Sequence, residues 1–267
     1  MKSQAKFLSF IILLTASVLF KAQVGLTVNP PRNYYTSAAG ESTVNKITVS
    51  NSSKTTSLTL TVSLNDWEYD AEGTNIMAEP GTLSNSCSQW ISIKPSTYLT
   101  LAAGESQELT VTVTPPAKRF DSLDVHTALL FITQTNPVES YNEKGALVNI
   151  SLRSGVKIYH RYNEAMNADV DFIDYNFDKK TKNLELVIEN KGNIWTDGTV
   201  ITEMVNQKDG TKYKLPDVPI YTMPKDKRNV HIPLPQGLKT GKYIANSTFS
   251  YGDDDTIKMA ELTFINE

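Results

Sequence analysis

Apolar and polar residues alternate along many short stretches of this chain. The four clearest runs, all rich in threonine or β-branched residues, cover 46–50, 58–64, 109–113 and 184–188. Successive side chains of a β-strand point to opposite faces, so each run predicts a strand with one buried face and one face toward solvent. No stretch beyond the N-terminal region shows a long helical stripe. The pattern therefore predicts an all-β protein.

Polar segments with glycine separate the predicted strands. Residues 39–42 and 103–106 both read Ala-Gly-Glu-Ser, and Asp209-Gly210 is a further turn signal. This spacing of strands and turns is typical of antiparallel β-sandwiches. In the second half of the chain, strands are predicted at 183–189, 198–206, 212–215, 228–234, 241–251 and 256–266.

The chain is long enough for two domains of this kind. The segment 160–168, HRYNEAMNA, is polar, contains no β-branched residue and precedes a new alternating run that starts at Val170. We therefore predict two immunoglobulin-like β-sandwich domains in tandem, at 23–160 and 161–267, each large enough to form its own core.

An export signal is predicted at residues 1–22. Lys2 and Lys6 precede an apolar run from Phe7 to Phe20, which is short for a membrane span, and Ala22 is the small residue before the expected cleavage point. The mature protein is then expected outside the cytoplasm. Only Cys87 is present, so no disulfide can form within the chain, and we expect this cysteine to be a small buried residue.

Residues for catalysis or for metal binding are scarce. His126, His160 and His231 are far apart in sequence and share no metal-ligand spacing, and Asp253-Asp254-Asp255 lacks the rhythm of a calcium loop. No catalytic group, metal or cofactor is therefore predicted. The formal net charge of −3 argues against nucleic acid as a partner.

Aromatic residues are frequent in the first half of the chain. Core packing explains most of them, although a glycan-binding face is an alternative if the rings converge. The residues concerned are Tyr34, Tyr35, Trp67, Tyr69, Trp90 and Tyr98.

The segment 146–162, ALVNISLRSGVKIYHRY, combines an apolar alternation with a charged run. Val148, Ile150 and Leu152 fall on one face at strand spacing, and Lys157, Tyr159 and Arg161 follow. Two interpretations are open at this point. The apolar residues either face the core of the first domain or form an exposed strand.

The order of these features along the chain resembles that of the PapD-like periplasmic pilus chaperones. In that family the alternating apolar residues complete a pilin subunit that lacks a strand, and a lysine and an arginine bind the pilin's C-terminal carboxylate. The resemblance implies that Val148, Ile150 and Leu152 are donor-strand residues and that Arg32 and Lys157 bind the carboxylate. Arg32 is expected just before a turn at 32–36. The short connection from Gln134 to Gly145, without a cysteine pair, resembles the short-loop subgroup.

The same resemblance implies a function in cell-surface fibre assembly. Pilin-like subunits are the expected clients, an outer-membrane usher is a further expected partner, and the periplasm is the expected location. Self-association through the donor strand is an additional expectation. The alternative from another class is a secreted adhesive or structural surface protein of two immunoglobulin-like domains, and an enzyme ranks third.

Overall fold

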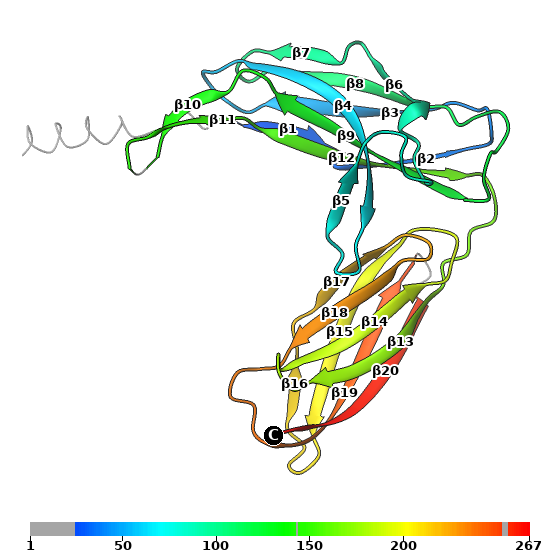
Figure 1. Cartoon of the computed structure of the whole chain (residues 1–267), viewed down its shortest axis with the longest axis vertical. Helices are drawn as coiled ribbons and strands as arrows, with labels where there is room; N and C mark the ends of the chain where they lie inside the picture. The colour runs from blue at the N-terminus through cyan, green and yellow to red at the C-terminus, as the bar shows by residue number, and fades with distance from the viewer. Residues whose placement is uncertain (1–24, 143, 253–255) are drawn as a thin grey trace, which may run out of the picture.

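The computed structural model describes residues 25–142, 144–252 and 256–267. The predicted export signal at 1–22 and the acidic run at 253–255 lie outside the described residues. The described chain forms two β-sandwich domains set at an angle to each other (Figure 1). Within it, no helix has the length and apolar character that a membrane crossing requires.

The first domain is built from strands that follow the predicted alternation; the runs at 46–50, 58–64 and 109–113 lie in β3, β4 and β8. The strands are β1 (Leu26–Asn29), β2 (Arg32–Ser37), β3 (Thr43–Asn51), β4 (Leu58–Tyr69), β5 (Asn75–Ala78), β6 (Ile91–Lys94), β7 (Tyr98–Leu101), β8 (Ser106–Val113), β9 (Val125–Gln134), β10 (Val138–Tyr141), β11 (Leu147–Ile150) and β12 (Arg153–Tyr162). A 3-10 turn, η2 (Ser88–Trp90), precedes β6.

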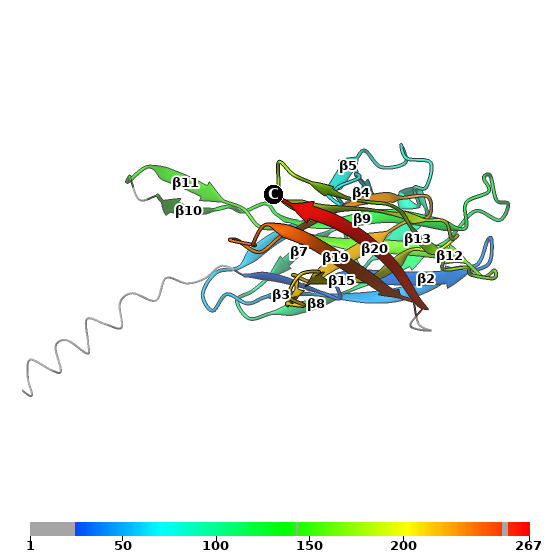
Figure 2. The ribbon, with the colours of Figure 1, turned by 90° about the horizontal axis from the view of Figure 1, so that it is seen from below.

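These strands form two sheets that face each other and one separate hairpin. The first sheet has the order β1-β3-β8-β6, and the second has the order β2-β12-β9-β4-β5, with β7 added beside β4. Among the described residues, strands β10 and β11 pair only with each other, in a two-stranded hairpin. Figure 2 shows this hairpin projecting beyond the end of the sandwich.

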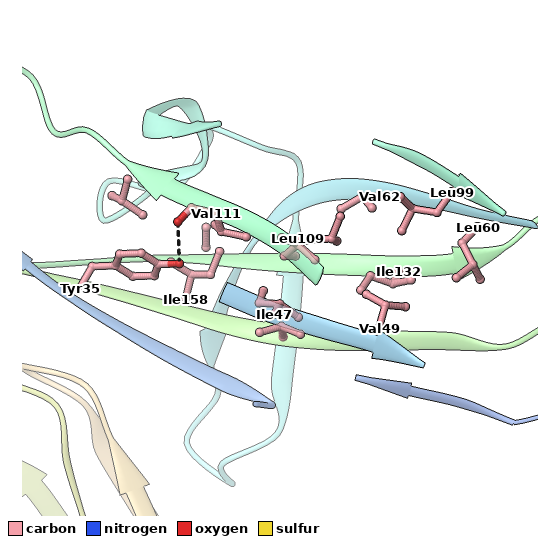
Figure 3. Packing of buried hydrophobic residues seen from close by; sticks show 14 of the residues in the cluster. Tyr35, Ile47, Val49, Leu60, Val62, Leu99, Leu109, Val111, Ile132 and Ile158 are labelled. Atoms are coloured by element: carbon pink, nitrogen blue, oxygen red, sulfur yellow. Dashed lines mark hydrogen bonds between the residues drawn. The ribbon is translucent and has the colours of Figure 1, made fainter. Parts of the chain in front are cut away.

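The core of the first domain lies between its two sheets (Figure 3). Ile47, Leu109, Ile132 and Ile158 are fully buried, and they come from both sheets. Burying a side chain of this size stabilises the fold by about 1.5–3 kcal/mol relative to leaving it exposed. The hydroxyl of buried Tyr35 donates to the carbonyl oxygen of Val111 at 3.4 Å, so its polar end is satisfied within the core.

The expected turn at 32–36 is wrong, because these residues belong to β2. Asn33, Tyr35 and Ser37 alternate with more exposed residues and point into the domain. Ser37 Oγ is hydrogen-bonded to His160 Nε2 at 3.0 Å. Polar residues in this strand resemble turn formers in sequence, but a cross-strand partner allows one of them to be buried.

Cys87 is fully buried, as the sequence predicted. Its N–H donates to the carbonyl oxygen of Thr127 at 2.9 Å, and burial raises the pKa of its thiol well above the ordinary value. Because the thiolate is the reactive form, this cysteine is inert in the folded protein.

The second domain contains β13 at the alternating run predicted from Val170, the six strands predicted between 183 and 266, and one further strand, β17. The strands are β13 (Val170–Asp178), β14 (Asn183–Asn190), β15 (Thr196–Asn206), β16 (Lys212–Lys214), β17 (Val218–Thr222), β18 (Lys227–Pro233), β19 (Gly241–Tyr251) and β20 (Thr256–Asn266). One sheet has the order β13-β14-β18, and the other has the order β16-β15-β19-β20, with β17 beside β15. The core contains Leu186, Ile188, Val200, Ile232 and Phe249.

The linker between the sandwiches lies between Tyr162, where β12 ends, and Val170, where β13 begins. This segment overlaps the predicted linker at 160–168. The β4–β5 hairpin of the first domain reaches toward β17 and β18 of the second (Figure 1).

Candidate functional site

Arg32 and Lys157 lie side by side where the two domains meet. Arg32 is the first residue of β2, and the parallel ladder between β2 and β12 pairs it directly with Lys157. Neighbouring strands are about 4.8 Å apart, so the two cationic side chains leave the sheet from adjacent positions. The fold therefore brings together two residues that are far apart in the sequence.

Neutral groups surround the ammonium of Lys157. Its Nζ donates to the hydroxyl of Tyr69 at 2.8 Å and to Oδ1 of Asn75 at 2.6 Å. It also lies 3.7 Å from the ring centroid of Trp67 and 4.1 Å from that of Tyr69. Ring faces attract cations, so the two aromatic residues help to hold the charge at this position.

No ion pair within the described residues joins a carboxylate to Lys157 or Arg32. Burial, together with the positive charges of Arg32 and Arg228, lowers the pKa of Lys157 to about 8. Both causes disfavour the charged form of an ammonium group. An anion placed next to this pair would relieve the repulsion and would be bound by charge-assisted hydrogen bonds.

Aromatic residues from both domains line the cleft beside Arg32. Its guanidinium lies 4.4 Å from the ring centroid of Tyr221 in the second domain. Tyr34 stacks on Tyr159 at 5.1 Å and lies 5.3 Å from Trp195. These rings and Arg32 line a cavity of only about 10 Å³, so this part of the cleft is closely packed.

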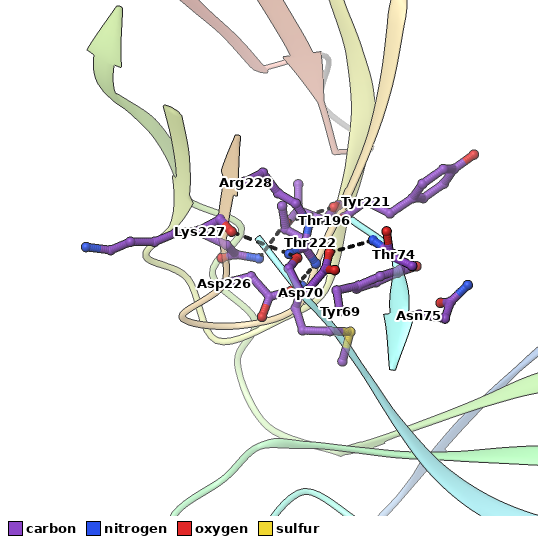
Figure 4. Close-up of polar contacts among 12 residues, drawn as sticks. Tyr69, Asp70, Thr74, Asn75, Thr196, Tyr221, Thr222, Asp226, Lys227 and Arg228 are labelled. Carbon is purple, nitrogen blue, oxygen red and sulfur yellow. Dashed lines mark hydrogen bonds and ion pairs between the residues drawn. The ribbon is translucent and has the colours of Figure 1, made fainter. Parts of the chain in front are cut away.

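A third cation, Arg228, differs from the first two because it has a carboxylate partner (Figure 4). Its Nη2 lies 2.6 Å from Oδ2 of Asp226, and its Nε donates to the carbonyl oxygen of Tyr221 at 3.0 Å. Its Nη1 donates to the carbonyl oxygen of Asp70, at the tip of the β4–β5 hairpin. Arg228 therefore joins this hairpin to the second domain.

Two further residues of β18 contact the same hairpin tip. Asn229 Nδ2 donates to Oε1 of Glu72 at 2.8 Å, and His231 Nε2 lies 2.6 Å from Oε2 of Glu72. The hydrogen bond with Glu72 is the main cause of a raised pKa of His231, and Glu185 raises it further. The β4–β5 hairpin is thus fixed at its tip by the second domain, and it holds Lys157 with Tyr69 and Asn75, the strand pair next to that tip.

The predicted donor residues lie on or next to the β10–β11 hairpin. Val148 and Ile150 are in β11 and are 39% and 47% exposed. Leu152 lies between β11 and β12, and its N–H donates to Oε1 of Gln134 at 3.2 Å. The opposite face is less polar than the alternation suggested, because it carries the exposed Leu147.

The six aromatic residues of the first half do not gather on one face. Tyr35 is in the main core, Trp90 packs against His126 and His160, and Tyr98 is exposed. Tyr34 and Tyr69 line the cleft described above, and Trp67 is buried next to the Lys157 ammonium. The structure therefore divides the predicted aromatic set among several environments.

Two of the three histidines are neighbours in space. His126 and His160 are paired across β9 and β12, and both are fully buried, with ring centroids 6.2 Å apart. His126 Nε2 lies 3.1 Å from Oδ2 of Asp121. No cluster of three or more metal-ligating side chains occurs in the part of the chain that the structure describes.

Three residues of the site were not identified from the sequence: Asn75, Tyr221 and Arg228. Tyr69 was named only as one of six aromatic residues, without a role beside Lys157. The spacing of Trp67 and Tyr69 places both on one face of a strand, which is the one local signal that was available. Asn75, Tyr221 and Arg228 come from different strands and two domains, so only the tertiary structure brings them to Lys157 and Arg32.

Comparisons with known proteins give structural matches only. No family model and no curated protein sequence matches the chain. The crystal structure of the YadV chaperone is 11% identical, and the match covers 90% of this chain and 99% of that one with a TM-score of 0.51. The Salmonella enterica SafA pilin in complex with the SafB chaperone is 13% identical, with coverage of 92% and 98% and a TM-score of 0.49.

A third match is the CsuC-CsuE chaperone-tip adhesion subunit complex of Acinetobacter baumannii. It is 11% identical, covers 89% of this chain and 97% of that one, and has a TM-score of 0.48. At identities this low the likeness concerns the fold, and the YadV match extends over both domains. The chain therefore has the two-domain immunoglobulin-like fold of the PapD-like pilus chaperones.

Proposed function

We propose that this protein is a periplasmic chaperone that binds pilin-like subunits and stabilises them for assembly into surface fibres. The single observation that carries the proposal is the direct pairing of Arg32 with Lys157, two partly buried cations without a carboxylate partner in the described residues. A pair of this kind at the end of a strand is suited to a terminal carboxylate. The two residues would hold the C-terminal carboxylate of the client.

The strand pairing gives the client a defined path. The ladder with β2 begins at Lys157, whereas residues 147–156 of β11 and β12 pair within the described chain only with β10 and β9. One edge of this segment is therefore open to a further strand. A client strand in that place would be in line with β2 and would run parallel to β12, because its carboxyl end has to reach Arg32.

The carboxylate would then set the register of the client strand. The same register brings Val148, Ile150 and Leu152 to the client, whose missing strand leaves apolar core and backbone groups uncovered. A one-residue slip would turn every client side chain to the other face, so fixing one end specifies the whole pairing. The donor residues would supply the apolar surface, and no nucleotide or other cofactor is required.

Several further features belong to the proposal. The similar structures described above are of chaperones, so we propose binding rather than catalysis as the activity. Export through residues 1–22 would place the protein in the periplasm, with an outer-membrane usher as the next partner. The exposed hairpin would also allow two copies to protect each other's donor strand, through the same edge that the client uses.

A titration tests the carboxylate site. The probe is a short N-acetylated peptide of alternating valine and threonine with a free C-terminal carboxylate, compared with the same peptide ending in an amide. Wild-type protein is expected to prefer the free acid. Arg32→Ala and Lys157→Ala should each weaken free-acid binding by roughly tenfold or more, since a charge-assisted hydrogen bond contributes about 1.5–3 kcal/mol.

The double variant should lose less than the sum of the single losses, because both cations act on one carboxylate. Lys46→Ala is the matched control, since Lys46 is an exposed cation of the other sheet that pairs with Glu108 at 2.6 Å. It should bind like wild type. Unchanged binding in both single variants would contradict the site and would favour the adhesive two-domain alternative.

A further inference from the structure

The side chains that hold Lys157 are neutral, unlike those that hold Arg228 and Arg119. Arg228 pairs with Asp226, and Arg119 pairs with Asp124 at 3.0 Å and Glu164 at 2.7 Å. Lys157 instead donates to a phenol and to a carboxamide. These partners accept from two of its three N–H donors and leave its charge uncompensated.

An ammonium group has three N–H donors and no acceptor. The hydroxyl of Tyr69 and Oδ1 of Asn75 accept from two of them, and the rings of Trp67 and Tyr69 cover the sides of the group. One donor is left for a ligand. A carboxylate in place of the Asn75 carboxamide would accept the same hydrogen bond but would also neutralise the charge.

Tyr69 and Asn75, which bind the Lys157 ammonium, are themselves held in place by the second domain. Tyr69 ends β4 and Asn75 begins β5, so both stand at the base of the hairpin tip that Arg228 contacts. The guanidinium of Arg228 also lies 4.5 Å from the ring centroid of Tyr69. The position of Lys157 therefore depends on side chains of both domains.

We propose that Asn75 and Tyr69 are positioning residues that hold the Lys157 ammonium next to Arg32 and, by being neutral, keep its charge available for a carboxylate. This inference rests on the proposed function, since it names how that site retains its preference for an anion. The charged and titratable groups around Lys157 are Arg32 on β2, Arg228 on β18 and Tyr69 on β4. None of these is a carboxylate.

The decisive variant is Asn75→Asp. It replaces the side-chain amide of an exposed residue with a carboxylate of the same shape and so adds a negative charge next to Lys157. In the free protein it should raise the pKa of Lys157 from about 8 toward the ordinary lysine value, measured by NMR of isotope-labelled lysine. It should also weaken binding of the free-acid peptide described above by roughly tenfold or more. Its unfolding free energy should equal or exceed that of wild type.

If Asn75 had a purely structural role, a variant with lower affinity would also have lower stability. Weaker binding with undiminished stability therefore distinguishes the positioning role from a structural one. Tyr69→Phe is the second variant: it keeps the ring and removes one acceptor, and it should weaken free-acid binding several-fold. Gln207→Glu is the matched control, because it adds a carboxylate in the exposed turn after β15 and should leave both the Lys157 pKa and the affinity unchanged.

The Lys157 pKa and the peptide affinity together separate the positioning role of Asn75 from carboxylate anchoring by Arg32 and Lys157. A Lys157 pKa that does not rise in Asn75→Asp overturns the positioning role, whatever the peptide does. Free-acid binding at wild-type strength in Asn75→Asp overturns it as well, provided that wild type prefers the free acid to the amide. If wild type binds the free acid and the amide equally well, carboxylate anchoring by Arg32 and Lys157 is refuted. The positioning role proposed for Asn75 and Tyr69 is then refuted with it, because it requires a bound carboxylate.

Discussion

Strands β11 and β12 are separated only by Ser151 and Leu152, and both contain alternating apolar residues, yet their environments differ completely. All four residues of β11 are exposed, whereas Val156 and Ile158 of β12 are fully buried. The sheet containing β3 and β8 covers β12, but β11 extends past its end and pairs only with β10 (Figure 2). Alternation thus specifies a strand with two unlike faces and does not specify what covers the apolar face.

The comparison also separates two uses of apolar side chains. In β12 they stabilise the first domain, and substitutions there should act on unfolding. In β11 they lie outside the three hydrophobic cores of the described residues, so substitutions there should act on binding. Four predictions test this division, from the largest expected effect to the smallest.

The largest effect is expected for Ile158→Asn in β12. Ile158 is fully buried in the main core, so the variant loses apolar contacts and buries an amide without an arranged partner. The free energy of unfolding should fall by about 3–5 kcal/mol. Urea unfolding measures it, with Ile158→Val as the control at about 1 kcal/mol. A change below that of the control would contradict the burial of this strand.

Acid should destabilise the first domain through the buried histidines of β9 and β12. Burial, with the charge of His126, lowers the pKa of His160 to about 4, and burial also lowers that of His126. In the unfolded chain the two histidines become protonated near pH 6.5, whereas in the folded protein they stay neutral to a lower pH. The folded protein therefore has its full stability above about pH 6.5 and loses stability as the pH falls toward 4. The loss should reach up to about 1.4 kcal/mol per histidine and pH unit.

Urea unfolding at about pH 7 and about pH 5 measures this slope. The variant His160→Gln should show a shallower slope than wild type, because it keeps a polar group near Ser37 without a titrating ring. Asp121 beside His126 opposes part of the effect. Equal slopes in the two proteins would exclude His160 as the cause.

Alkaline pH should weaken carboxylate binding at β12 without unfolding the protein. The pKa of Lys157 is lowered to about 8, so its charge is present below that pH and is lost above it. Affinity for the free-acid peptide should be constant below about pH 8 and fall by up to about tenfold per pH unit above it. Lys157→Arg should remove this dependence, since arginine stays charged. A flat wild-type profile would assign the anchoring to Arg32 alone.

The smallest effect on stability is expected for Ile150→Asn in β11. Ile150 is 47% exposed and outside every core of the described chain. The free energy of unfolding should change by less than about 0.5 kcal/mol, while binding of a subunit that lacks a strand should be lost. Thermal melts and co-purification measure the two effects. A large fall in melting temperature would show that β11 stabilises the domain, and it would contradict the division of roles between β11 and β12.

The sequence by itself determined the strands and the division into two sandwiches. Period-two alternation is a local property of the backbone, and it located β3, β4, β8 and most strands of the second domain without knowledge of their partners. It failed at β2, where Asn33 and Ser37 resemble turn formers, because their burial depends on neighbours that are distant in the chain. Pairing Arg32 with Lys157 required the family resemblance.

Only the tertiary structure decided how the cleft is built. Lys157 donates to the neutral side chains of Tyr69 and Asn75, and the hairpin that carries these two residues is held by Arg228 of the second domain. These contacts join residues that share no spacing or motif, because packing between sheets and between domains creates them. For the same reason, the exposure of Val148 and Ile150 follows from where the covering sheet ends, which alternation within one strand cannot encode.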